Sequence, residues 1–112
     1  MNRGEIWCVN LAAPGSSEPG FRRPVIIVSS NAFNHSQINT VLAVAVSTNL
    51  NLSKAPGNVM IPQKQSGLPR DSVANVSQVI TATKSFLTGC VGSVPPKLMQ
   101  QIDNGLRLVM SL

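Results

Sequence analysis

The chain has few of the residues from which metal sites and base-stacking surfaces are built. Its 112 residues include four acidic side chains, one histidine and no tyrosine, and aromatic residues make up 4%. Four scattered carboxylates and one histidine do not form a convincing metal site. The scarcity of aromatic rings weighs against a surface that stacks nucleic-acid bases. We therefore expect any chemistry to proceed without a metal or another cofactor.

Long apolar runs and paired cysteines are also missing. No apolar segment reaches the length that crosses a bilayer, and the first residues do not resemble a signal peptide. Cys8 and Cys90 have no CxxC spacing, and Cys8 lies in an apolar strand pattern that is typical of a buried free thiol. These features predict a cytoplasmic protein without a membrane partner.

The charge balance is basic, with nine Lys and Arg against four Asp and Glu and a net charge of +5. This balance suits an anionic partner such as nucleic acid, although a merely basic protein would have the same charge. Only 12% of the residues are charged, and small domains with so few charges commonly cover apolar surface by oligomerising. We expect a single domain over residues 1–112 that forms a homodimer.

Short alternating or β-branched segments, separated by glycine, proline and small polar residues, predict many short strands. The predicted strands cover residues 4–11, 24–30, 40–47, 58–62, 71–76 with 77–81 as one or two pieces, and 89–92. The segment 40–47 is nearly all apolar, which is typical of a central strand covered on both faces. Pro24 is expected at the first residue of its strand, where no ladder N–H is needed.

One long helix is predicted over residues 95–109. Its apolar face is formed by Leu98, Ile102, Leu106 and Val109, with Met99 beside them. Ser93 is the candidate N-cap ahead of two prolines. Gly105 costs the helix about 1 kcal/mol relative to alanine, which a close approach of the helix backbone to the sheet would explain. Together these elements predict a mainly β fold, a bent antiparallel sheet or partly open barrel with a helix packed on it.

Residues 18–30, EPGFRRPVIIVSS, place two adjacent arginines ahead of a rigid apolar strand. The planar guanidinium of Arg23, next to Pro24, can hold two oxygens of one phosphate, which a lysine does less specifically. Glu18 in the same loop is a candidate general base, or a carboxylate that holds Arg22 or Arg23. An Arg23 that is only paired with Glu18 is the structural alternative.

The segment 40–47 is followed by a polar stretch, and two hydroxyl residues, Ser47 and Thr48, stand at this point. The Ser47 hydroxyl can hydrogen-bond a phosphate oxygen or orient an RNA 2′-hydroxyl, and Thr48 competes for this role. A covalent nucleophile is not expected, because no histidine is placed to activate Ser47. A hydroxyl that only satisfies backbone groups at the strand end is the alternative.

Further RNA contacts are assigned by residue type. The candidates are Arg22, Lys54 and Lys64 for phosphates, Gln78 for a base edge, and His35 for a contact from a polar loop. His35 is the only histidine, a residue that titrates near neutral pH, but a lone surface histidine is not by itself a catalyst. Each charged candidate would equally serve as a solvated surface charge.

Six segments carry a resemblance to a known family. They are RGEIW at 3–7, GSSEPGFRRPVIIVSS at 15–30, AVAVSTN at 43–49, GLPRDSV at 67–73, SQV at 77–79 and the terminal LRLVMSL. Their residues, order and spacing resemble the MazF/PemK family, the toxin halves of bacterial toxin–antitoxin pairs. The resemblance covers essentially the whole chain.

The resemblance implies an SH3-like, CcdB-like barrel with a C-terminal helix, acting as a homodimer. It implies a metal-independent endoribonuclease, or mRNA interferase, that cuts single-stranded RNA by attack of the 2′-hydroxyl and leaves a 2′,3′-cyclic phosphate and a 5′-hydroxyl. It also implies a cognate antitoxin whose acidic segment lies over the RNA groove, with operator DNA bound only through the antitoxin complex.

Three residues match positions that the family uses for function. Arg23 matches the arginine before proline, Ser47 matches a strand-end hydroxyl that is more often threonine, and Glu18 matches the loop acid. Two positions depart from the pattern, since Ile80 stands where many members have arginine and Thr83 where many have aspartate. The first departure removes a phosphate or base contact, and so it bears on the recognised RNA sequence more than on activity.

Two rival functions use the same elements. A toxin of the same barrel that poisons DNA gyrase would carry its determinants at the end of the C-terminal helix, which residues 109–112 do not obviously supply. A non-catalytic RNA-binding barrel would call for more aromatic side chains than this chain has. The combination of Arg23 with Ser47 favours an enzyme that cuts RNA.

Overall fold

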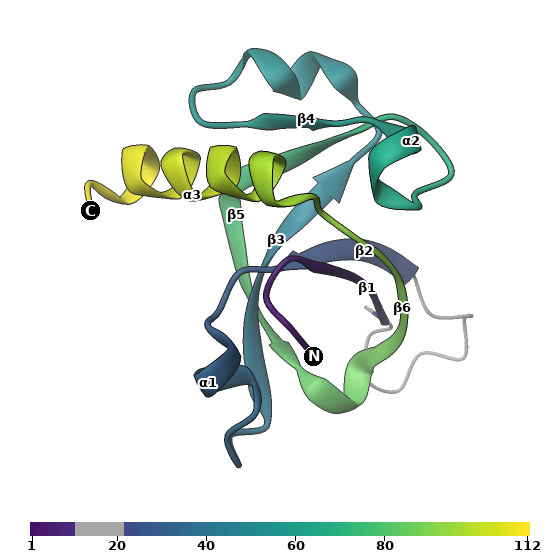
Figure 1. Cartoon of the computed structure of the whole chain (residues 1–112), viewed down its shortest axis with the longest axis vertical. Coiled ribbons are helices and arrows are strands. Elements are labelled where there is room, and N and C mark those ends of the chain that lie inside the picture. The colour runs from purple at the N-terminus through teal and green to yellow at the C-terminus, as the bar shows by residue number, and fades with distance from the viewer. Residues whose placement is uncertain (11–21) are drawn as a thin grey trace.

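The structure is a computed structural model of the chain, and it describes residues 1–10 and 22–112. In this part of the chain, six strands form one sheet: β1 (Glu5–Asn10), β2 (Arg22–Ile27), β3 (Thr40–Ser47), β4 (Val59–Ile61), β5 (Ser72–Thr83) and β6 (Leu87–Ser93). Their order is β4-β5-β3-β2-β1-β6, and every neighbouring pair is antiparallel. The sheet is strongly curved, with β4 and β6 at its two edges (Figure 1). The predicted mainly β, partly open barrel is confirmed.

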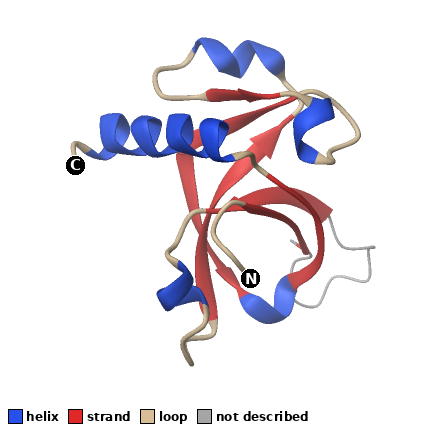
Figure 2. Ribbon diagram, viewed as in Figure 1, coloured by secondary structure: helices blue, strands red, loops and turns tan. Residues whose placement is uncertain are grey.

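Helical segments fill the connections between the strands and follow the last strand. They are α1 (Asn31–Asn34), η1 (Leu50–Lys54), α2 (Gln63–Ser66), η2 (Lys84–Phe86) and the long helix α3 (Pro96–Met110). α3 lies against β4 and β5 (Figure 2). Pro95 stands at its N-cap without a side-chain hydrogen bond. The prediction of Ser93 as N-cap is wrong, because Ser93 still belongs to β6 and pairs with Glu5.

Each face of the sheet carries an apolar cluster. Successive side chains of a strand point to opposite faces, so an apolar run contributes to both clusters. In β3, Val44 and Val46 join the cluster that includes the buried face of α3. Val41 and Ala43 join the cluster that β1, β2 and β6 complete. All four side chains are at most 5% exposed, which confirms a central strand covered on both faces.

α3 buries the predicted face except at its last predicted position. Met99, Ile102 and Leu106 are buried against the sheet, and Leu98 packs at the margin of the same cluster. Val109 is 43% exposed, so its assignment to the buried face is wrong. The reason is visible in Figure 1, where the last turns of α3 extend past the strands toward the C-terminus.

Gly105 lies where α3 meets the loop before β4. A Cβ atom at this position would be 2.1 Å from the carbonyl oxygen of Gly57, which only a glycine hydrogen can avoid. The predicted close approach of the helix backbone exists, but its neighbour is a loop rather than a strand.

Strand β2 starts earlier than predicted. It begins at Arg22, two residues before Pro24, and ends at Ile27. Its pairing with β3 begins only at Val25, whereas Pro24 pairs with Cys8 of β1. Pro24 therefore lies where the strand has a ladder on one side, a place that tolerates a missing N–H.

Strand β5 is one continuous element with a bulge. Val79 pairs with Val44, and Asn75 pairs with the next residue of β3, Ala45. Residues 76–78 therefore have no partner in β3. Such bulges bend a strand and redirect its side chains.

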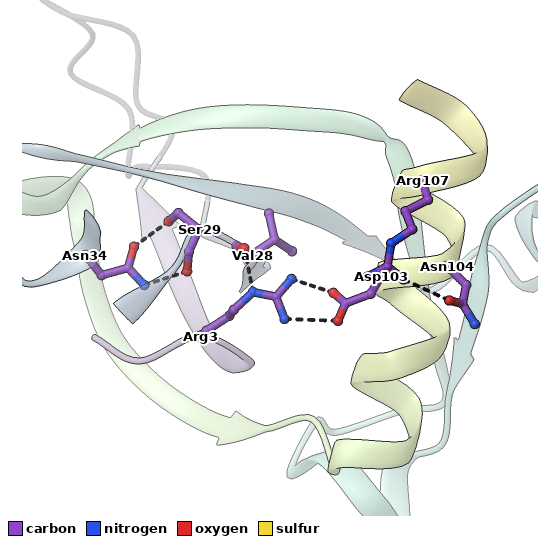
Figure 3. Close-up of polar contacts among 7 residues, drawn as sticks. All are labelled: Arg3, Val28, Ser29, Asn34, Asp103, Asn104 and Arg107. Carbon is purple, nitrogen blue, oxygen red and sulfur yellow. Dashed lines mark hydrogen bonds and ion pairs between the residues drawn. The ribbon is translucent and has the colours of Figure 1, made fainter. Parts of the chain in front are cut away.

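Arg3 links the segment before β1 to the segment after β2 and to α3 (Figure 3). Its two terminal nitrogens bond both carboxylate oxygens of Asp103, and its Nε donates to the carbonyl of Val28 at 2.8 Å. Its backbone N–H donates to Oδ1 of Asn31 at 2.7 Å. Sequence reasoning missed this ion pair, because its partners are 100 residues apart in the chain.

Two smaller expectations also have an outcome. Cys8 is free, as predicted, but the prediction that it is buried is wrong, because it is half-buried; Cys90 is free and exposed. No helix in the ranges 1–10 and 22–112 combines the length and apolar character that spanning a membrane requires.

Candidate active site

A surface pocket of about 260 Å³ lies where β2 begins, β3 ends and β5 begins. It is lined by Arg22, Arg23, Pro24, Val46, Ser47, Thr48 and Ser72. Four of these residues are sequence-predicted phosphate or RNA contacts, namely Arg22, Arg23, Ser47 and Thr48. The two segments that the sequence marked separately, the arginine pair and the hydroxyl pair, therefore line one pocket.

Strand pairing explains why these distant segments meet. Val25 of β2 pairs with Ala45 of β3. Continuing this antiparallel register by two residues sets Arg23 opposite Ser47, and Ser47 in turn pairs with Val73 of β5. Residues two apart on a strand share a face, so Arg23 and Ser47 point to the same face of the sheet, where both line the pocket.

The pocket is basic. Arg22 and Arg23 are both exposed, and their side chains leave opposite faces of β2. The described residues that line the pocket include no carboxylate. Two guanidinium groups beside several hydroxyls suit a phosphate diester. Glu18, predicted as a general base or arginine partner, lies outside the described residues.

Three hydroxyl groups complete the lining. Ser47 is half-buried, and its Oγ accepts a hydrogen bond from the backbone N–H of Asn49 at 3.0 Å. This bond is the strand-end role expected as the alternative, but it leaves the Ser47 O–H able to donate to a bound oxygen. Ser72 is buried, and its Oγ donates to the carbonyl of Arg70 at 3.1 Å. Sequence reasoning missed Ser72, because nothing local to the DSV triplet links it to the arginines.

The other predicted RNA contacts do not line this pocket. They are His35, Lys54, Lys64 and Gln78. His35 follows α1, at the opposite end of β3 from the pocket, and an eight-residue strand is about 25 Å long. Lys54 lies on η1, Lys64 on α2 and Gln78 in the bulge of β5. Their contacts with RNA stay predictions.

A larger pocket, about 370 Å³, lies between the N-terminus and the last turns of α3. Its lining residues are Arg3, Asp103, Leu106, Arg107, Met110 and Leu112. Arg3 is paired with Asp103 there, and half of the lining is apolar. This composition suits a phosphate less well than the pocket of Arg22 and Arg23 does.

Titratable groups are few around the fold. Among the described residues, no three or more His, Cys, Asp or Glu come together in a way that could hold a metal ion. The pKa of Glu5 is lowered, chiefly because the backbone N–H of Asn2 donates to its carboxylate at 2.8 Å, with the Trp7 indole as a further donor at 3.0 Å. Glu5 begins β1 and does not line the basic pocket.

Comparisons with known proteins agree with the fold. The model of a family described as PemK-like, MazF-like toxin of type II toxin–antitoxin system matches residues 2–110. The endoribonuclease MazF2 of Mycobacterium bovis is 43% identical over 112 residues, covering 100% of this chain and 98% of that protein. The endoribonuclease EndoA of Bacillus subtilis is 28% identical, covering 100% of this chain and 96% of that protein. A solved endoribonuclease in complex with its cognate antitoxin, from a mycobacterial species, is similar with a TM-score of 0.80 and 26% identity, covering 100% of this chain and 96% of that chain. The chain therefore belongs to the family of PemK-like, MazF-like toxins of type II toxin–antitoxin systems.

Proposed function

We propose that this chain, an endoribonuclease toxin of its family, cuts single-stranded RNA at the pocket formed by β2, β3 and β5. The RNA itself supplies the nucleophile, its 2′-hydroxyl, which attacks the adjacent phosphorus. The bond to the 5′-oxygen breaks, and the products are a 2′,3′-cyclic phosphate and a 5′-hydroxyl. The observation that carries the proposal is the gathering of two arginines and two strand-end hydroxyls at one pocket.

The roles follow from the chemistry of each side chain. Arg23 is the electrostatic clamp, because its planar fork can hold two phosphate oxygens while negative charge gathers on the phosphorane. It is not assigned as a base, since a guanidinium is effectively never deprotonated in a protein. Ser47 donates its O–H to a phosphate oxygen or orients the 2′-hydroxyl. Arg22, which leaves the other face of β2, and Thr48 hold the neighbouring RNA.

Two protons must move in this reaction, one from the 2′-hydroxyl and one to the leaving 5′-oxygen. Glu18 is the candidate acceptor of the first proton, or else the carboxylate that orients the arginines. No step calls for a Lewis acid, because the arginines can neutralise the charge that a metal would otherwise stabilise. We propose that the reaction is metal-independent on this ground.

The proposal includes partners. A related endoribonuclease has been solved in complex with its cognate antitoxin, and we propose an antitoxin partner for this chain, with operator DNA bound only through that complex. We also propose a homodimer, because apolar side chains stand exposed at the end of α3, namely Leu108, Val109, Met110 and Leu112. An mRNA substrate would place its action in the cytoplasm.

Cleavage of a long RNA in EDTA, with 5′ ends mapped by primer extension, tests this function. We expect discrete cuts with 5′-hydroxyl ends from the wild type. Arg23→Ala should cut roughly 10²–10³-fold more slowly, the usual effect of removing one group that stabilises a developing oxyanion. Arg107→Ala is the matched control, because it removes the same charge from the exposed surface of α3 and should cut normally.

Three results would contradict the proposal. Equal rates for the two arginine variants would mean that the pocket does not hold the scissile phosphate. Intact RNA with a wild type that is still toxic to cells would indicate a toxin that binds another target, such as gyrase. Intact RNA without toxicity would leave a non-catalytic RNA-binding barrel.

A further inference from the structure

Three amide side chains form a hydrogen-bonded relay at the bulge of β5. Nδ2 of Asn58 donates to Oδ1 of Asn75 at 3.1 Å, and Nδ2 of Asn75 donates to Oε1 of Gln78 at 3.0 Å. Oγ of Ser77 also donates to Oδ1 of Asn75, at 3.2 Å. Asn58 and Asn75 are half-buried, whereas Gln78 is exposed, so the relay runs from the interior to the surface.

Backbone groups fix the direction of the Asn58 amide, and the side-chain bonds pass that direction on to Asn75 and Gln78. Nδ2 of Asn58 donates to the carbonyl of Leu52 at 2.8 Å, and its Oδ1 accepts from the N–H of Val76 at 3.0 Å. A carbonyl can only accept and an N–H can only donate, so the Asn58 amide has one possible orientation. Asn75 must then present Oδ1 to Asn58 and Nδ2 to Gln78. Gln78 must present Oε1 to Asn75, which turns its Nε2 group outward.

The relay lies on the face of the sheet that carries Arg23 and Ser47. Asn75 pairs with Ala45, two residues before Ser47 on β3, so the two positions share a face. The level of Asn75 is about 7 Å along the strands from Ser47, and Gln78 bonds to Asn75 from the side away from the pocket, so Gln78 suits the base of a nucleotide near the one held there. The bulge at residues 76–78 turns the exposed Gln78 out of the regular ladder at this point.

We propose that Gln78 reads one base of the RNA by donating from Nε2, and that Asn58 and Asn75 are positioning residues that set this direction. A donor is accepted by the O6 of guanine or the O4 of uracil. The same edge of adenine or cytosine carries an amino group, which is itself a donor. Where Nε2 faces the exocyclic group of the base, the relay thus selects a keto base over an amino base at one position beside the cut. This inference rests on the proposed function, because it needs an RNA held at the pocket.

Asn75→Asp tests the relay without changing the reading residue. One oxygen of the new carboxylate keeps the bonds from Asn58 and Ser77, and the other replaces the donor that faced Gln78. Gln78 must then turn its amide over, donate from Nε2 to that carboxylate and present Oε1 to the base. We expect the keto preference at that one position to fall about tenfold or to reverse toward adenine and cytosine. A tenfold change is the usual discrimination that a good hydrogen bond to a base edge provides.

Gln78→Glu makes the same change at the base itself. A glutamate has only acceptors to offer, so it should favour an amino base at the same position. The matched control is Gln65→Glu, which adds the same charge at an exposed site on α2. Added negative charge can slow all cutting by repelling RNA, but it changes no base preference, and the control measures that general loss.

The readout is the sequence around every cut in a pool of random RNA, collected from the new 5′-hydroxyl ends, with thermal melting to show that each variant is folded. A position whose keto preference falls or reverses in both Asn75→Asp and Gln78→Glu, but not in Gln65→Glu, supports the proposal. Unchanged preferences at every position in either variant overturn it while the proposed function stands. A wild type that cuts no RNA overturns the proposed function, and this inference with it.

Discussion

Gly105→Ala is the substitution for which the structure makes the sharpest prediction. A helix gains about 1 kcal/mol when an internal glycine becomes alanine, so the sequence by itself predicts a more stable protein. The structure predicts the opposite sign. The new methyl group would stand 2.1 Å from the carbonyl oxygen and 3.0 Å from the carbonyl carbon of Gly57.

The size of the change in the free energy of unfolding depends on which atoms must move to make room for the methyl group. Both partners are backbone atoms, so no side chain can rotate away, and α3 must separate from the loop by about 1 Å to restore ordinary contact. Overpacking of this kind costs about 1–3 kcal/mol or more, and the upper end applies where backbone meets backbone. After the gain in helix propensity, we expect the free energy of unfolding to fall by about 2 kcal/mol. For a domain of this size that lowers Tm by roughly 8–16 °C.

Urea unfolding at equilibrium measures this change, and Gly89→Ala provides the control. A Cβ at Gly89 would meet nothing within 4 Å, so the free energy of unfolding should change by no more than about 0.5 kcal/mol. A Gly105→Ala protein as stable as the wild type, or more stable, would refute the argument. It would show that helix propensity outweighs the contact with Gly57.

Three further predictions concern ion pairing, pH and assembly. Arg3→Lys keeps the charge but cannot bond both oxygens of Asp103 and the Val28 carbonyl together, so urea unfolding should show a loss of about 1–2 kcal/mol. The folded pKa of Glu5 lies below its ordinary value of 4.5, so its stabilisation is present above that value and is lost as the pH falls through the folded pKa. Glu5→Gln should therefore lose less stability than the wild type on acidification below that value. Light scattering should give the mass of a dimer at micromolar concentration.

Each of these has a contradicting result. Equal stability of Arg3→Lys and a matched Arg107→Lys variant would mean that the fork geometry of the Asp103 pair contributes nothing. An identical loss of stability in acid for Glu5→Gln and wild type would place the responsible carboxylate elsewhere. A monomer mass at micromolar concentration would contradict the homodimer.

Much of the fold could be predicted from local patterns. The bounds of β3, Thr40–Ser47, match the predicted segment 40–47, because an apolar run with polar ends needs no distant partner to be recognised. α3 was predicted to within a residue at each end, since helical spacing and the two prolines are local signals. The buried face and the N-cap of α3 were less predictable. Val109 is exposed because α3 extends past the sheet, and Ser93 is not the N-cap because it pairs with Glu5 in β6.

Some residues of the candidate site could be predicted from local patterns, and others could not. Arg23 and Ser47 could be selected from the sequence, because their residue types and their place at strand ends suit phosphate chemistry. Ser72 could not, since its place in the pocket comes from the pairing of β5 with β3. The same is true of Asn58 and Asn75, which are ordinary polar residues until the sheet brings them together.

By itself the sequence determined the mainly β class, the long C-terminal helix, the basic charge and the residue types of the candidate site. These are properties of composition and of short periodic patterns. Only the tertiary structure decided which strand ends meet and that Arg23 and Ser47 line one pocket. It also decided that α3 tolerates only glycine beside Gly57 and which way the amide of Gln78 faces. Strand register and buried hydrogen bonds join residues far apart in the chain, and no local pattern carries that information.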